Sequence, residues 1–409
     1  FSMNNNAASD SFATLLETAL NKAETFFEQI LPGLKPLAEN KLSQLVAIFE
    51  TGSVVERQLV ARLFVEHLKE DGAAFLSSRL DIRRHKLFIE AAAVIGTLQY
   101  EPALEALKAG ISMHTPDLVL PAVKAIAMMK PSRKVDEVLV SFYLNFPDET
   151  KLSQSIRYLL PRHETLVHEM LEKYRSLNAD RRMWVLKYLS ETSNPESLKL
   201  FSEELQTEPL ERGLYCVKGL GKIGTEQAVE VLKKQAGSSE WFLRKRIVEA
   251  LGMSNCPGAV EPILEMLNDE SVQVRAAAVE SLSKVGSLKP DLLIQKLEKA
   301  GKVFKINLVR AMGQLKNEKF VKPLVEVLKD RDTLFFSIDA IGDLGFQQAE
   351  FSLRRLLKDE VWFNRLNALE ALAKLQISEL GTIAQEAAQD ENDMVRNAAG
   401  RILAALKAK

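Results

Sequence analysis

The sequence has few cysteines and no long apolar run, and each shortage excludes a class of protein. Of 409 residues only Cys216 and Cys256 are cysteines, which is too few for a disulfide framework and is typical of a reducing compartment. No apolar run reaches the roughly 20 residues of a membrane-spanning helix. No stretch of useful length alternates with period two, so we expect no strands. These absences favour a helical, cytoplasmic protein.

An excess of charge of one sign is also lacking. Lys and Arg total 54 against 55 for Asp and Glu, so the chain has no overall basic excess of the kind that binds nucleic acid. A local basic stripe stays possible. The first residues lack the charged and apolar regions of a signal peptide, and Phe1 and Ser2 before Met3 resemble residues left by cloning. We expect residues 1–10 to be disordered and residues 11–41 to form an N-terminal helical cap.

What the sequence does contain is an internal repeat of about 31 residues. Each repeat carries an amphipathic, often alanine-rich segment that ends in a large apolar residue, and these anchors stand 29 to 33 residues apart. The anchors are Leu63, Ile95, Ile126, Leu159, Leu189, Leu220, Leu251, Leu282, Met312, Ile341, Leu372 and Leu403. Another amphipathic helix precedes each anchored one, so the pattern predicts about twelve helical hairpins.

The positions of prolines and glycines fit the expected starts and ends of these helices. Pro262 and Pro323 fit the first turn of a helix, where a missing N–H costs little. Gly252, Gly286 and Gly345 fall at or just after expected helix ends, where glycine is a common cap. The sequence therefore predicts an all-α fold in which the hairpins stack into an α-solenoid.

The repeat resembles a known family. An aspartate followed six residues later by arginine, and then an alanine-rich helix ending Leu-x-x-x-Gly, is similar to the HEAT repeat, particularly the short HEAT-like form of phycobilisome-lyase-type proteins. The matching pairs are Asp269/Arg275, Asp359/Arg365 and Asp390/Arg396. The resemblance implies one continuous HEAT-like repeat solenoid over residues 42–409, a superhelix in which these pairs bridge neighbouring repeats as a ladder.

Two repeats depart from the aspartate–arginine pattern. Ser238/Arg244 lacks the acid, and Lys299/Lys305 lacks both identities. We therefore expect the ladder to be broken at these two repeats. Fold resemblance by itself says little about function.

The anchored helix predicts which residues face outward. At about 100° per residue, positions −8, −4, −3, −1 and 0 from the anchor share the core side, and position −2 points away. In HEAT-like solenoids the second helices line the concave surface, so the resemblance places this column along the groove. It starts with Lys124, Arg157, Lys187 and Lys218 and becomes mainly acidic from Glu249 onward. The cations are either solvated or paired between repeats, or they form a basic stripe for an acidic partner.

Large apolar residues flank this column. Met183 and Trp184 precede Lys187, and Leu214 and Tyr215 precede Lys218. Aromatic residues beside cations are enriched at interface centres, although the same residues could fill space between repeats. Trp241 and Trp362 stand where a hydrophobic staple would sit, and we interpret both as structural. The predicted partner-binding residues are Lys124, Arg157, Met183, Trp184, Lys187, Leu214, Tyr215 and Lys218.

Three patterns that suggest chemistry do not hold in context. Residues 219–224 match G-x-G-x-x-G, but they end a helix and follow no strand, which a dinucleotide site requires. HEAT-repeat hydroxylases bind iron through His-Glu pairs from different repeats, whereas His163-Glu164 and His168-Glu169 lie five residues apart in one helix and diverge by about 140°. HEAT-like DNA glycosylases use aromatic residues with a nearby carboxylate, and no tryptophan here has a carboxylate one turn after it. We expect no catalytic residue, metal or cofactor.

The sequence therefore predicts a non-catalytic cytoplasmic scaffold or adaptor for protein–protein interaction. Its partner would be a protein with an acidic and apolar segment, bound in the concave groove. The alternative is nucleic-acid binding or base excision on the basic N-terminal half of that groove. The sequence leaves the partner's identity and the oligomeric state open.

Overall fold

The computed structural model describes residues 42–206 and 210–408, and every regular element in these ranges is a helix. The predicted all-α fold is confirmed. The expected disordered start and N-terminal cap, residues 1–10 and 11–41, lie outside the described residues. No described helix is both long and apolar enough to span a membrane.

The helices alternate between two sets that pair as successive hairpins. The first helices are α3 (Leu42–Thr51), α5 (Lys69–Ser77), α7 (Leu104–Lys108), α9 (Arg133–Asn145), α11 (His163–Tyr174), α13 (Leu198–Glu204), α15 (Glu226–Gln235), α17 (Val260–Met266), α19 (Pro290–Glu298), α21 (Val321–Val327), α23 (Glu350–Leu356) and α25 (Leu380–Ala387). The second helices are α4 (Val54–Leu63), α6 (His85–Thr97), α8 (Pro116–Met128), α10 (Glu149–Leu159), α12 (Ala179–Leu189), α14 (Leu210–Ile223), α16 (Trp241–Met253), α18 (Val272–Val285), α20 (Lys302–Gln314), α22 (Leu334–Leu344), α24 (Trp362–Leu375) and α26 (Asp393–Lys407).

Short turns of other helix types connect several of these elements. A π-helical segment, η1 (Phe64–Leu68), joins α4 to α5, and the others are 3₁₀ turns before first helices: η2 (Glu101–Ala103), η3 (Leu160–Arg162), η4 (Pro195–Ser197), η5 (Pro257–Ala259), η6 (Gly286–Leu288), η7 (Glu318–Phe320) and η8 (Gln347–Ala349). Polar side chains start several α-helices by accepting a hydrogen bond from a backbone N–H two or three residues on. Ser53, Ser132, Asp148, Thr225 and Asn392 act in this way.

The repeat period predicted from the sequence coincides with the hairpins. Each of the twelve anchors lies in one of the second helices, α4 to α26. Eleven of them are at most 1% exposed, and Leu403, in the last described helix, is half-buried. Each repeat therefore buries its anchor between its own two helices and its neighbours, as expected of stacked repeats.

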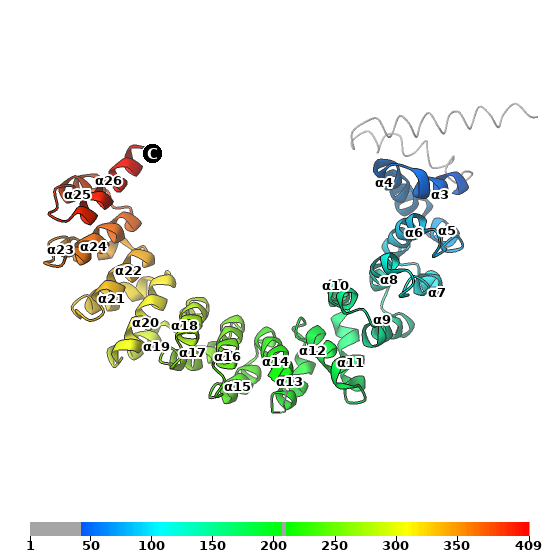
Figure 1. Ribbon diagram of the computed structural model, residues 1–409, viewed down its shortest axis with the longest axis horizontal. Helices are drawn as coiled ribbons and strands as arrows, with labels where there is room; N and C mark the ends of the chain where they lie inside the picture. Colours follow the sequence, from blue (N-terminus) through cyan, green and yellow to red (C-terminus); the bar gives the residue numbers. More distant parts are fainter. Residues whose placement is uncertain (1–41, 207–209, 409) are drawn as a thin grey trace, which may run out of the picture. The chain divides into compact units, whose positions relative to one another are not determined.

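Contacts between Cα atoms divide the chain into two compact units, which we describe separately. Unit 1 ends at Tyr188 and unit 2 begins at Leu189. In unit 2 the even-numbered helices form one layer and the odd-numbered helices the other (Figure 1). Within each unit neighbouring even-numbered helices pack on one another. In unit 1, α8 packs on α6 and on α10, and in unit 2 each even-numbered helix from α14 to α26 packs on the next.

Glycine lets the even-numbered helices approach closely. A Cβ added to Gly313 in α20 would lie 2.7 Å from the Cα atom and the carbonyl oxygen of Ala340 in α22. A Cβ on Gly221 in α14 would lie 2.8 Å from the carbonyl oxygen of Ala250 in α16. In both cases the glycine directly follows the anchor of its repeat, and the alanine directly precedes the anchor of the next repeat. The distance between the two helices therefore depends on small residues at these positions.

Two of the three glycines predicted to end helices do so. Gly345 follows α22 with a φ of 83°, the left-handed conformation expected of a cap, and Gly286 follows α18. The prediction for Gly252 was wrong, because this residue lies inside α16. Its Cβ would meet the Cβ of Ser281 at 2.6 Å, so close packing requires glycine there. Pro262 lies in the first turn of α17, as predicted.

The predicted ladder exists, and its geometry corrects one of our two expected breaks. Arg244 donates to both carboxylate oxygens of Asp269 in the next repeat at 2.7 and 2.9 Å. Arg365 binds Asp390 in the same way, at 2.8 Å to each oxygen. An arginine bridges to the acid of the following repeat, so the missing acid at Ser238 does not interrupt the ladder at Arg244.

At the repeat with Lys299 and Lys305, the ladder is interrupted toward the preceding repeat but continues to the following one. Arg275, whose bridge would have to reach an acid at Lys299, donates instead to the carbonyl oxygens of Asp269 and Glu270 in its own repeat, at 2.7 and 3.0 Å. Lys305 nevertheless forms an ion pair with Asp330 at 2.8 Å. Lysine can therefore replace arginine in the bridge, but a lysine in place of the acid removes it.

The ladder predicts a loss of stability in acid. Hydrogen bonds from Arg365 hold the pKa of the Asp390 carboxyl below its ordinary value of 3.8, against the opposing effect of burial. A carboxyl with a depressed folded-state pKa stabilises the fold above its unfolded-state pKa, and this contribution is lost as the pH falls through the folded-state pKa. We expect Arg365→Gln to be less stable than the parent at neutral pH, with the difference shrinking below about pH 4. Urea midpoints measured across the acid range test this.

Arg355→Gln is the matched control for that measurement, because Arg355 is exposed and no described partner binds it. We expect its urea midpoint to follow the parent at every pH. A stability difference between Arg365→Gln and the parent that stays constant from neutral to acid pH would contradict the role of Asp390.

Candidate partner-binding face

The predicted column at position −2 is solvent-accessible along its length, and none of its members is buried. Lys124 on α8 and Arg157 on α10 are exposed, and Lys187 on α12 is half-buried. These three lie in unit 1. Lys218 on α14 is also half-buried and lies in unit 2.

Lys124 and Arg157 line a common depression on the even-numbered helices of unit 1. One hollow of about 390 Å³ is lined by both cations together with Tyr158, Met128 and Pro131. A second hollow of about 230 Å³ shares Lys124, Met128 and Tyr158 with the first. Its further lining is largely apolar and comes from Ile89, Ala93, Leu120 and Pro121. We call the two together the α8–α10 hollow.

The charges that line the α8–α10 hollow are all positive, since no carboxylate belongs to the lining of either part within the described residues. Arg162 is the third cation, but it is buried and paired with Asp136, with Nη2 and Nε at 2.5 and 3.2 Å from Oδ1. It also donates to the carbonyl oxygen of Met129 at 2.5 Å. The charge available to a ligand therefore comes from Lys124 and Arg157.

Arg157 is held in place by its neighbour Tyr158. The guanidinium Nη2 donates to the Tyr158 hydroxyl at 2.7 Å, and the guanidinium carbon lies 4.7 Å from the ring centroid. An arginine stacked on an aromatic ring keeps its remaining N–H donors directed outward at little further cost in entropy. Tyr158 was not among the predicted site residues, although its place next to Arg157 in the sequence is the signal that could have indicated it.

Trp184 and Lys187 form one structural group on α12. The tryptophan is 8% exposed, and the Lys187 ammonium lies 4.3 Å from its ring centroid. Lys187 also donates to the Ser153 hydroxyl on α10 at 2.5 Å. Met183 is half-buried. The indole is therefore largely covered by the fold, and the Lys187 ammonium lies over its ring.

The predicted site residues of unit 2 are partly buried, and Lys218 is engaged in an ion pair within the unit. Leu214 and Tyr215 are half-buried on α14, and Lys218 pairs with Glu191 at 2.5 Å. Lys222 binds the same carboxylate at 2.6 Å. Burial opposes ionisation of Glu191, yet hydrogen bonds from the two lysines hold its pKa below the usual range. Pairing between repeats, one of the two interpretations of the column, therefore describes Lys218.

Packing explains the glycine pattern of residues 219–224. A Cβ on Gly219 would meet the ring of Phe201 at 2.3 Å, and Gly221 touches Ala250. Gly224 follows α14 with a φ of 64°. Each glycine is therefore required by helix packing or by the end of the helix.

The two His-Glu pairs lie on α11 among surface side chains. Nε2 of His168 is 3.5 Å from Glu172, and Glu169 pairs with Lys173 at 3.4 Å. In residues 42–206 and 210–408 no three His, Cys, Asp or Glu side chains gather closely enough to hold a metal ion.

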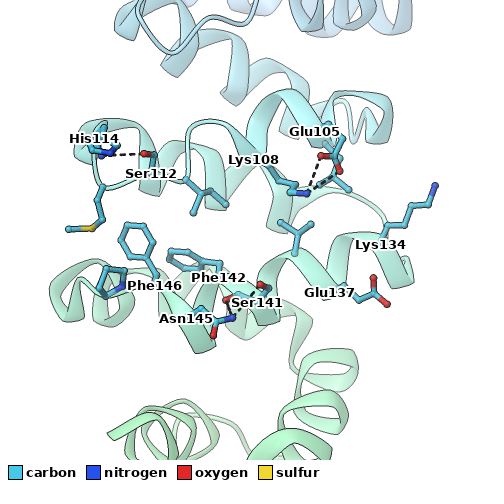
Figure 2. A pocket seen from close by; sticks show the side chains of 15 residues that line it. Glu105, Lys108, Ser112, His114, Lys134, Glu137, Ser141, Phe142, Asn145 and Phe146 are labelled. Atoms are coloured by element: carbon cyan, nitrogen blue, oxygen red, sulfur yellow. Dashed lines mark hydrogen bonds and ion pairs between the residues drawn. The ribbon is translucent and has the colours of Figure 1, made fainter. Parts of the chain in front are cut away.

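A larger hollow on the odd-numbered helices of unit 1 was not predicted. It has a volume of about 850 Å³ and lies between α7 with the chain that follows it and α9 (Figure 2). Phe142 and Phe146 form its apolar wall, with ring centroids 5.2 Å apart. It arises because α7 has five residues and α9 has 13, so part of α9 lacks a covering helix. Its rim carries both charges, including the Glu105–Lys108 pair at 3.0 Å.

Comparison with known protein families supports the assignment of the repeat. A family described as HEAT repeats matches residues 209–283 and 230–300. The chain is built from HEAT-like repeats. The narrower resemblance to phycobilisome-lyase-type proteins stays a prediction, and no protein with a curated description matches the chain.

Two solved structures show the same architecture in the karyopherin Kap121p. Kap121p bound to Ste12p matches with a TM-score of 0.50 and 13% identity, over 98% of this chain and 52% of Kap121p. Kap121p bound to Pho4p matches with a TM-score of 0.51 and 13% identity, over the same shares. At this identity the likeness shows the fold, and the chain spans about half the length of Kap121p.

Proposed function

We propose that this HEAT-like repeat protein is a non-catalytic cytoplasmic scaffold or adaptor that binds a partner protein on its even-numbered helices. The observation that carries the proposal is the α8–α10 hollow, in which an apolar floor is bordered by Lys124 and Arg157 and, among the residues that the structure describes, by no carboxylate. This combination suits a partner segment with an apolar side chain next to one or more carboxylates. The apolar contact would supply affinity, and the cations orientation and association rate.

The other predicted residues are proposed as further contacts, in each unit separately. On α12 of unit 1, Lys187 with Trp184 and Met183 would contact a segment that leaves the hollow past α10, to which Lys187 is hydrogen-bonded through Ser153. In unit 2 we propose Leu214, Tyr215 and Lys218 as further contacts. The structures of Kap121p bound to Ste12p and to Pho4p support the functional class, because Kap121p has a similar fold and binds other proteins.

A binding measurement with charge reversals tests the proposal. The probe is a fluorescent peptide with leucine or phenylalanine between glutamates. We expect Lys124→Glu with Arg157→Glu to weaken its binding at least about tenfold, because a rim charge that attracted the peptide would then repel it. The control is Lys134→Glu with Lys173→Glu, which reverses two exposed cations on α9 and α11 and should leave the affinity unchanged.

Three results would contradict the proposal. The first is equal weakening in the control variant. The second is unchanged binding of a peptide whose apolar residues are replaced by serine. The third is preferential binding of a DNA duplex, with an affinity that falls steeply with salt, which would favour the alternative of nucleic-acid recognition.

A further inference from the structure

The even-numbered helices of unit 2 begin with apolar side chains that the fold leaves exposed. These residues lie at the N-terminal ends of α16, α18, α20, α24 and α26, and each is between 38% and 64% exposed. They are Trp241, Val272, Val303, Trp362, Phe363 and Met394. In α22, which begins closer to its anchor, the second residue is Phe335. It is half-buried and stacks on Phe363 with ring centroids 5.1 Å apart.

Direct contacts place these helix ends side by side. The side chain of Arg244 in α16 reaches Asp269, which stands just before α18. Lys302 in α20 reaches Asp332 before α22 at 3.2 Å, and the Phe335–Phe363 contact joins α22 to α24. Arg365 reaches Asp390 before α26 in the same manner. Between them α18 packs on α20, so the exposed residues lie on successive helices of unit 2, and we call this row the apolar edge.

Packing within the chain does not account for this exposure. We interpreted Trp241 and Trp362 as hydrophobic staples, which lie before a helix and pack against its next turn. Both are instead the first residue of their helix, and each ring contacts the following phenylalanine edge to face. More than a third of each tryptophan stays open to solvent. An exposed apolar row of this extent is typical of a surface that another molecule covers.

Carboxylates stand beside the exposed apolar residues at both ends of the edge. Glu240 precedes Trp241 and Glu360 lies two residues before Trp362; both are exposed, and neither has an ion-pair partner among the described residues. Glu270 lies near Val272 and is 83% exposed even though Arg244 touches it. Glu391, three residues before Met394, is likewise 83% exposed although Arg365 touches it.

The middle of the apolar edge is closer to neutral. Lys302 pairs with Asp332, and Arg331 pairs with Asp359 at 2.5 Å. Lys299, three residues before α20, is exposed. The acidic surplus therefore belongs to α16 and α18 at one end and to α24 and α26 at the other.

We propose that the apolar edge binds a segment of a partner protein in which every third residue is apolar and lysine or arginine stands between. Neighbouring helices lie about 8–10 Å apart. This spacing matches every third residue of an extended polyproline II chain, which has three residues per turn and rises about 3.1 Å per residue. An apolar residue at each third position would meet the edge, and the basic residues between them would meet Glu240, Glu270, Glu360 and Glu391. A cation with an apolar stem also suits a tryptophan beside a carboxylate. This surface differs from the α8–α10 hollow in place and in charge.

The experiment measures binding of a synthetic peptide of about 15 residues, long enough to follow six helix ends when extended. Its apolar residues stand at every third position, with lysines between them. We expect Glu240→Lys with Glu360→Lys to raise the dissociation constant at least about tenfold. The control is Glu230→Lys with Glu265→Lys on α15 and α17, which makes the same change of net charge at exposed glutamates of the other layer and should change binding less than about twofold.

A second variant separates apolar recognition from general attraction between charges. Val272→Ser with Met394→Ser removes two exposed apolar contacts without touching the core, and we expect it to weaken binding severalfold. The proposal is overturned if both edge variants bind like the parent. It is also overturned if the control weakens binding as much as the edge reversal, or if a peptide with serine at the apolar positions binds equally well. The acidic peptide used for the α8–α10 hollow should bind all these variants alike, so failure of one proposal leaves the other standing.

Discussion

Leu282→Ala is expected to lower the free energy of unfolding by about 2–5 kcal/mol. Leu282 is fully buried in α18, and α18 packs on α16, α17 and α20, so truncation leaves a cavity between three neighbours. Repeats interact with their nearest neighbours, and the loss should therefore remain local. We expect hydrogen exchange to accelerate in α16 to α20 while α24 to α26 exchange as in the parent.

Leu406→Ala in α26 is the matched control, because the same truncation occurs at a side chain that is 39% exposed. Its unfolding free energy should change by well under about 1 kcal/mol. Acceleration of exchange at equal rates from one end of unit 2 to the other, caused by Leu282→Ala, would contradict the description of this unit as a stack of locally stabilised repeats.

Gly313→Ala should destabilise the protein although alanine is the better helix former. The new Cβ would lie 2.7 Å from the Ala340 backbone, so α20 and α22 must separate. Overpacking of this kind costs about 1–3 kcal/mol and sometimes more, which exceeds the gain of about 1 kcal/mol in helix propensity. Chemical denaturation of the purified variant measures the net effect.

Gly400→Ala gives the same substitution inside a helix without a neighbour. No atom lies within 4 Å of a Cβ at Gly400 in α26, so the gain in helix propensity should appear alone and stabilise the protein by about 0.5–1 kcal/mol. We therefore expect opposite signs for the two glycine substitutions. Equal effects would show that α20 and α22 can separate at no cost, and that Gly313 does not set their distance.

The sequence was sufficient to predict the core because the information is local. Each anchor, from Leu63 to Leu372, is buried as the pattern required, since the 3.6-residue period of a helix places positions −4, −3 and 0 on one face. The column at −2 was predicted to be accessible for the same reason, and Lys124 and Arg157 are exposed. Neither inference needed to know which repeats touch.

The sequence was less informative wherever the answer depends on a neighbouring repeat. Arg244 was expected to lack a partner because the acid of its own repeat is missing, yet it binds Asp269, 25 residues further on. The sequence left open whether Lys218 is paired between repeats or available to a partner, and the structure shows its ion pair with Glu191. Trp184 is only 8% exposed, and Lys187 beside it bonds to Ser153 on α10.

By itself the sequence determined the helical class, the repeat length, the buried anchors and the outward column, because these follow from periodicity along a single helix. Only the tertiary structure decided which charges are paired, which apolar side chains stay exposed and where hollows open. Those properties depend on the lengths of neighbouring helices, such as α7 against α9, and on distances between residues about 25 to 35 positions apart. The α8–α10 hollow and the apolar edge are therefore products of stacking, since each is assembled from single residues contributed by successive repeats.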